Sequence, residues 1–157
     1  MTMITAKTVA GGRLIVYRIK NRDVVGLKAI RHGKDHINHY FVPLEPLSDD
    51  PLTVLYMDYA AEVRDCHDTF NLELIPLAAD APVDVGAILS NETGTYLKAR
   101  EPTKGIMSFV YVNLNDGEMR RRQERQIGAV YRWSLARIGT DPQTGCPLPQ
   151  DSGLSNP

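Results

Sequence analysis

Hydrophobic and polar residues alternate with a period of two in several short stretches of the chain, which is typical of β-strands. In residues 13–20, Ile15, Tyr17 and Ile19 fall on one face of an extended chain and Arg18 on the other. Turn-forming residues bound this stretch on both sides, as they bound most of the others. The segments predicted as strands from alternation or from a short apolar run are 13–20, 24–31, 36–42, 69–75, 83–89, 95–100 and 106–114.

Two of these segments carry more specific expectations. The turn 32–35 predicts that strands 24–31 and 36–42 form a hairpin. Residues 106–114 are apolar almost throughout, which predicts a central strand buried on both faces. Residues 52–64 are ambiguous, because 52–56 fits a strand whereas 58–64 fits a short helical turn.

Residues 115–138 are open to two interpretations. Asn115 and Glu118 have the spacing of a helix capping box, and apolar residues recur at helical intervals up to Ile138, where Gly139 is placed as a stop. The alternative interpretation makes Asp116-Gly117 a hairpin turn, followed by a strand. We favour the helix, although a glycine at position 128 weakens it by about 1 kcal/mol relative to alanine.

The sequence therefore predicts an α+β fold: a predominantly antiparallel β-sheet, sandwich- or barrel-like, with one C-terminal amphipathic helix. The alternative is an all-β fold. A chain of 157 residues is long enough for one domain with its own core, and we expect that domain to span 1–139. Residues 140–157 are rich in proline and glycine, and we expect a disordered tail there.

The net charge of −1 hides a division into blocks. Residues 1–42 contain eight Lys or Arg and two Asp or Glu, whereas residues 43–84 contain ten Asp or Glu and one Arg. Residues 118–138 are basic again, with six Arg and two Glu. Such blocks either face each other inside one fold or form a polarised surface that attracts a charged partner or a second copy of the chain.

No apolar stretch approaches the length of a membrane span, and the start of the chain lacks the apolar core of an export signal. Cys66 and Cys146 are then expected to be reduced thiols. These features predict a cytoplasmic protein with no membrane partner.

The candidate metal ligands are His32, His36 and His39. In a strand, His36 and His39 would point to opposite faces, so convergence on one ion is not expected. We interpret all three as surface residues of the hairpin and expect no metal site and no cofactor.

The cluster of Asp65, Cys66 and His67 is the one place from which an enzyme could be argued. A cysteine nucleophile needs a general base brought near it by the fold, and adjacency in sequence does not provide one. The chain lacks the glycine-rich phosphate-binding motifs and the nucleophile elbow. A non-catalytic function is therefore favoured.

The basic run at 120–125 is the most distinctive feature of the sequence. In a helix, Arg122, Arg125 and Trp133 would lie roughly on the face away from the core. Arg and Trp are favoured at interfaces, so we predict that Arg121, Arg122, Arg125 and Trp133 bind a partner. In a strand, Trp133 would face inward and this prediction would fail.

Three functions remain for comparison with the structure. The first is a non-catalytic interaction or structural protein that acts in a homo-oligomer or a larger assembly, such as a bacterial or phage assembly component. The second is a small nucleic-acid-binding module that uses the basic N-terminal strands and residues 120–125. The third is an enzyme with a dispersed site near Cys66 and His67.

Overall fold

In the computed structural model, all regular structure among the described residues is β-strand. The structure describes residues 3–44, 52–103, 105–121 and 128–138. Twelve strands lie in these ranges: β1 (Met3–Thr5), β2 (Leu14–Ile19), β3 (Arg22–His32), β4 (Ile37–Pro43), β5 (Leu55–Met57), β6 (Glu62–Asp65), β7 (Phe70–Pro76), β8 (Ile88–Asn91), β9 (Gly94–Thr103), β10 (Ile106–Asn113), β11 (Met119–Arg120) and β12 (Ala129–Arg137).

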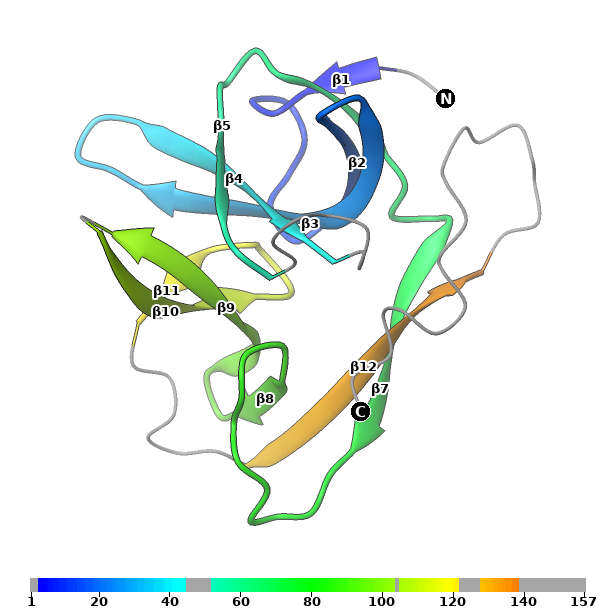
Figure 1. Cartoon of the computed structure of the whole chain (residues 1–157), viewed down its shortest axis with the longest axis vertical. Helices are drawn as coiled ribbons and strands as arrows, with labels where there is room; N and C mark the ends of the chain where they lie inside the picture. Colours follow the sequence, from blue (N-terminus) through cyan, green and yellow to red (C-terminus); the bar gives the residue numbers. More distant parts are fainter. Residues whose placement is uncertain (1–2, 45–51, 104, 122–127, 139–157) are drawn as a thin grey trace.

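The strands form two antiparallel sheets of six. The first sheet has the order β1-β6-β2-β3-β4-β5, and the second has the order β11-β10-β9-β8-β12-β7. In Figure 1, β2, β3 and β4 lie in the upper half of the view, and β7, β8 and β12 lie below them. Each sheet is therefore built from one continuous half of the chain.

The predicted hairpin of strands 24–31 and 36–42 is confirmed, and a second hairpin, which was not predicted, precedes it. Strand β2 pairs with β3 from Leu14 opposite Leu27 to Ile19 opposite Arg22, which leaves a two-residue loop. Both loop residues have positive φ, 49° at Lys20 and 64° at Asn21. Positive φ at both positions is typical of the turns whose twist matches that of paired strands. Strand β4 then pairs with β3 over its full length, as the turn at 32–35 predicted.

The predicted C-terminal helix is wrong, and with it the α+β class. The described part of 115–138 consists of a turn, the short strand β11 and the long strand β12, so the fold is all-β among the described residues. Strand β12 pairs with β8 at one end and with β7 at the other. The expected tail, 140–157, lies outside the described residues.

Local hydrogen bonds explain why the capping-box spacing misled. The side-chain Oδ1 of Asn113 accepts the backbone N–H of Asn115 at 2.7 Å, and Gly117 has a φ of 75°. Such Asn-centred turns are the usual alternative to a helix start. Residues four apart share a face in both a helix and a strand, so the spacing of Tyr131 and Leu135 fits either. Trp133, between them, shares their face only in a strand, and it packs in the same core.

Three smaller expectations also need correction. Residues 58–64 contain a turn and the start of β6, not a helical turn. The strand predicted at 83–89 begins at Ile88. Strand β10 is buried only in its second half, whereas Ile106, Met107 and Phe109 are exposed.

Three buried apolar clusters hold this arrangement, the smallest of them around Leu89 and Tyr96 in the second sheet. The largest core lies between the sheets and includes Leu27 from β3, Leu97 from β9 and Trp133 from β12. A smaller core lies within the first sheet, around Ile15 and Phe41. The first sheet curls around this smaller core, because the segment after β1 is hydrogen-bonded to the segment after β5. The N–H of Lys7 donates to the carbonyl of Tyr59 at 3.0 Å.

The sheets are also joined by backbone hydrogen bonds at two corners. The N–H of Ile30 donates to the carbonyl of Gly117 at 2.8 Å, and the N–H of Val54 donates to the carbonyl of Arg100 at 2.8 Å. These bonds fix the first sheet against the turn before β11 and against β9. No membrane-spanning helix occurs in the part of the chain that the structure describes.

Candidate binding pocket of the first sheet

Trp133, expected on an exposed helix face, lies in the core between the sheets. Its indole Nε1–H donates to the carbonyl oxygen of Gly86 at 2.5 Å. A buried indole N–H needs such an acceptor, so both its apolar body and its polar edge are occupied inside the protein. Trp133 is therefore not available to a partner.

Arg121 lies beside a buried carboxylate. Its guanidinium contacts Oε1 of Glu101 at 3.1 Å, and Arg31 binds the same carboxylate with two hydrogen bonds of 2.6 and 2.8 Å. Bonding to Glu101 raises the pKa of Arg31. The structure thus gives Arg121 an internal partner, whereas Arg122 and Arg125 lie outside the described residues and their partner binding stays a prediction.

The residues of the Asp65–His67 cluster do not converge. Asp65 accepts a 2.7 Å hydrogen bond from Nε of Arg13, which raises the pKa of that guanidinium. Cys66 is buried in the core between the sheets. His67 turns toward β2, where its Nδ1 accepts the backbone N–H of Leu14 at 3.1 Å. A thiol in an apolar core is poorly placed to act as a nucleophile.

The hairpin histidines were expected to face opposite ways. Instead, His36 precedes β4, and both His36 and His39 line one cavity. His32 lies 4.0 Å from a carboxylate oxygen of Glu118. Across the ranges that the structure describes, no three His, Cys, Asp or Glu side chains are placed to hold a metal ion.

The cavity has a volume of about 620 Å³, which is within the usual range for ligand sites. It lies between the end of the β3–β4 hairpin and the segment that follows β5. We call it the tyrosine pocket. Its lining residues are Lys7, Asp35, His36, Ile37, Asn38, His39, Tyr56 and Tyr59.

The two tyrosines are unusually exposed for aromatic residues. Tyr56 is 66% exposed and Tyr59 is 63% exposed. The ring of Tyr56 meets the ring of Tyr40 edge to face, with 5.8 Å between the centroids, and this contact fixes its position on the sheet. The pocket therefore offers aromatic faces that the protein's own core does not cover.

A buried ammonium group lies behind the histidine wall. Lys28, fully buried on β3, donates to the carbonyl oxygens of Ala6 at 2.6 Å and Val9 at 3.0 Å, and to Nδ1 of His39 at 3.1 Å. Burial lowers the pKa of Lys28 to about 8. Burial, and then the charges of Lys28 and Lys7, lower the pKa of His39.

These contacts fix the protonation state of His39. A neutral imidazole that accepts a hydrogen bond at Nδ1 carries its proton on Nε2. His39 is therefore a neutral donor at neutral pH, held in one orientation by Lys28.

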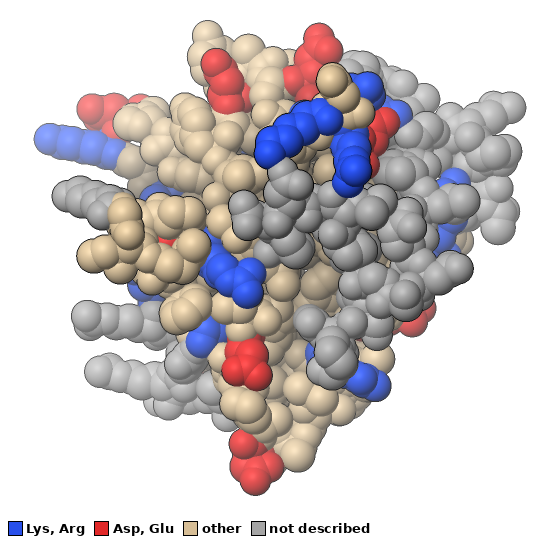
Figure 2. All heavy atoms as spheres, viewed as in Figure 1, with Lys and Arg blue, Asp and Glu red and all other residues tan. Residues whose placement is uncertain are grey.

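Among the described residues, the basic and acidic blocks of the sequence contact each other. Figure 2 shows basic and acidic side chains side by side on the face in view. Arg13 of the basic N-terminal block pairs with Asp65 of the acidic block. The lining of the tyrosine pocket itself carries one lysine and one aspartate.

Sequence reasoning missed the tyrosines. Tyr56 and Tyr59 lie in the ambiguous stretch 52–64, inside the acidic block, and were not considered as site residues. A signal was present: residues three apart fall on opposite faces of an extended chain, so the two rings could not both pack into one core from a single strand.

Comparison with known proteins gives no family assignment: no protein-family model, curated protein or solved structure matches this chain.

Proposed function

We propose that the protein is a small nucleic-acid-binding module that holds a single strand at the tyrosine pocket. The observation that carries this proposal is the presence of two exposed tyrosines in one cavity with Lys7 and two histidines. Proteins that bind single strands combine aromatic side chains for base stacking with cationic groups along the phosphate path.

Each group has a defined part in this proposal. Tyr56 and Tyr59 stack on bases. Lys7 contacts a phosphate, and Nε2–H of His39 donates to a phosphate or base oxygen. Asp35 repels phosphate, so it directs the backbone toward the Lys7 side, and its carboxylate can accept from an exocyclic amino group of a base.

The surrounding sequence is consistent with such a site. Strands β2, β3 and β4 belong to the basic block 1–42, which carries a net charge of +6. The sequence predicted a nucleic-acid surface made of the basic N-terminal strands and residues 120–125. The proposal uses the N-terminal strands and does not depend on residues 122–127. A cytoplasmic location belongs to the same proposal.

Fluorescence anisotropy of a labelled oligothymidylate and a labelled oligouridylate tests it. We expect saturable binding that weakens as salt is added, because bound phosphates release counterions. Tyr56→Ala and Tyr59→Ala should each weaken binding by about 5- to 150-fold, the effect of losing one stacked base. Lys7→Ala should weaken binding and lower the salt dependence.

The matched control is Phe109→Ala, which removes an exposed aromatic ring from the second sheet and should leave binding unchanged. Absence of binding at low salt, or equal affinity in the tyrosine variants and the wild type, would refute the proposal.

A second candidate function is self-association, and one specific observation favours it. Ile106, Met107 and Phe109 are 70%, 52% and 47% exposed on the first half of β10. Strand β11 pairs with β10 only at Tyr111 and Val112, so within the described residues this half of β10 has β9 alone as a neighbour. An exposed apolar edge strand is a template for pairing with a second copy.

Size-exclusion chromatography with light scattering at low and high salt checks this candidate. A dimer that persists in high salt and dissociates in Ile106→Lys would support edge pairing, since the apolar contact does not depend on screening. A monomer at all concentrations would remove the candidate.

A further inference from the structure

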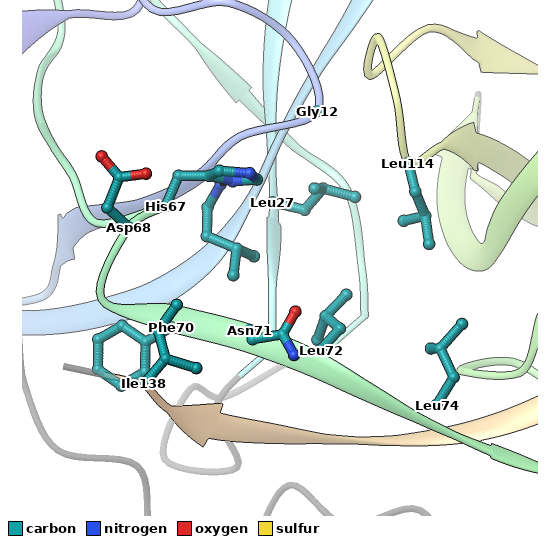
Figure 3. Close-up of a pocket in the computed structure, with 11 residues that line it drawn as sticks. Gly12, Leu27, His67, Asp68, Phe70, Asn71, Leu72, Leu74, Leu114 and Ile138 are labelled. Carbon is teal, nitrogen blue, oxygen red and sulfur yellow. Dashed lines mark hydrogen bonds between the residues drawn. The ribbon is translucent and has the colours of Figure 1, made fainter.

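A second cavity, of about 470 Å³, opens between the two sheets. Figure 3 shows it from the side, with β7 along its floor and Leu27 and Leu114 facing it from above. We call it the inter-sheet cleft. Its apolar lining includes Leu14, Leu27, Leu72, Leu74, Leu114 and Ile138. The cleft is distinct from the tyrosine pocket, with which it shares no lining residue.

One end of the cleft is polar. His67, Asp68 and Asn71 line it, and in Figure 3 the ring of His67 points into the space while the carboxylate of Asp68 points away. Because Nδ1 of His67 accepts the N–H of Leu14, the ring proton lies on Nε2. The cleft therefore combines leucine walls with an imidazole N–H donor at one end.

This combination is typical of small-molecule sites, in which mostly apolar walls carry a few polar groups that orient the ligand. The donor calls for an acceptor on the ligand. A neutral imidazole does not compensate a negative charge, so no described group of the cleft lining favours an anion over a neutral molecule at this donor. The occupant with matching chemistry is thus an uncharged, mostly hydrocarbon molecule that carries one acceptor oxygen.

We propose that the inter-sheet cleft binds such a molecule, for example a medium-chain ketone, with its oxygen at Nε2 of His67 and its chain against the leucines. This site is independent of the proposed nucleic-acid function. Its apolar walls come from both sheets, Leu14 and Leu27 from the first and Leu72 and Leu74 from the second.

The protein has a built-in reporter for the cleft. Trp133 is the sole tryptophan in the chain and lies directly opposite Leu74 in the β12–β7 register. Side chains of directly opposite residues share a face and lie about 5 Å apart at Cβ. A molecule that packs on Leu74 changes the surroundings of the indole, so tryptophan fluorescence follows binding.

The test is a fluorescence titration of the full chain with 2-octanone and with octanoate. We expect saturable binding of 2-octanone and at least about tenfold weaker binding of octanoate, because the carboxylate loses hydration at a neutral donor. His67→Phe should reduce the affinity for 2-octanone about fivefold, the usual effect of one neutral hydrogen bond.

The leucine variants keep the test decisive if His67→Phe unfolds. Leu74 and Leu77 are equally exposed, at 39% and 38%, but only Leu74 lines the cleft. Leu74→Asp should weaken 2-octanone binding more than about tenfold, since it places a charge in the apolar wall, whereas Leu77→Asp should leave it unchanged. A linear, non-saturating response, equal effects of the two variants, or octanoate binding as tight as 2-octanone would overturn the proposal.

Discussion

The ammonium of Lys28 and the imidazole of His39 form a buried contact, 3.1 Å long, across two strands of the first sheet. Lys28 on β3 lies directly opposite Phe41 on β4, and His39 is two residues from Phe41 on the same face. The same ammonium holds the carbonyls of Ala6 and Val9. One side chain thus connects the N-terminal segment, the sheet and the wall of the tyrosine pocket.

Burial of Lys28 makes stability depend on pH in a defined window. Its pKa is about 8 in the folded protein and near 10.5 when unfolded. Between these values the unfolded chain binds more protons, so the free energy of unfolding rises with pH. The rise from pH 8 to 10.5 attributable to Lys28 is on the order of 3 kcal/mol, measured by urea denaturation against Lys28→Met.

Lys28→Met removes this dependence but leaves three acceptors, among them the carbonyls of Ala6 and Val9, without their donor. The variant should therefore lack the rise above pH 8 while other titrating groups change both proteins alike. Parallel stability curves for the two proteins would contradict a buried, charged Lys28.

We expect the buried carboxylate of Glu101 to contribute more to the free energy of unfolding than its half-exposed partner Arg121 does. Glu101→Gln should lower the free energy of unfolding by about 2 kcal/mol, since it weakens hydrogen bonds to charged groups. The side chain of Arg121 is 54% exposed. Arg121→Ala should therefore cost less than about 1 kcal/mol. Chemical denaturation of both variants gives the comparison, and a reversed order would show that Arg121 is the main partner.

Gly26 is required by close packing. A Cβ at this position would collide with the ring of Phe41 and the carbonyl oxygen of Val42. Gly26→Ala should therefore destabilise the fold by about 3 kcal/mol or more. The control is Gly105→Ala, because a Cβ there meets nothing within 4 Å and only its φ of 78° is strained. That variant should cost about 1 kcal/mol, and thermal unfolding distinguishes the two.

The position of Trp133 is directly measurable by fluorescence. A buried indole should emit at short wavelength and resist quenching by iodide, whereas an indole among arginines on an exposed helix would be quenched readily. Trp133→Phe removes the donor to Gly86 and should lower the free energy of unfolding by about 2 kcal/mol. Strong iodide quenching of the native protein would contradict the strand assignment of β12.

Three strands of the first half, β2, β3 and β4, could be predicted because pattern and turn chemistry agree there. Alternation in 13–20 indicated the strand β2, and the turn at 32–35 indicated the hairpin of β3 and β4. The segment 115–138 could not be assigned in this way, because Tyr131 and Leu135 fit both periods. Pairing of β12 with β7, which is distant in sequence, decides it.

The candidate site depended even more on tertiary structure. Lys7, His39 and Tyr59 are far apart in sequence and meet because the first sheet curls, which brings the segment after β1 to the segment after β5. Of the predicted partner residues, Trp133 lies inside the protein because its neighbours come from β7 and from Gly86, both distant in the chain. Charge blocks were visible in the sequence, and their facing each other inside one fold was one of the two interpretations that it left open.

The division of the chain into one sheet per half has a consequence for biosynthesis. The first sheet and its small core around Ile15 and Phe41 are complete once residue 65 has left the ribosome. Its other face, with Leu14 and Leu27, stays bare until the second sheet has been translated. The nascent protein thus passes through a stage with a finished sheet and an uncovered apolar face, which is the kind of surface that chaperones recognise.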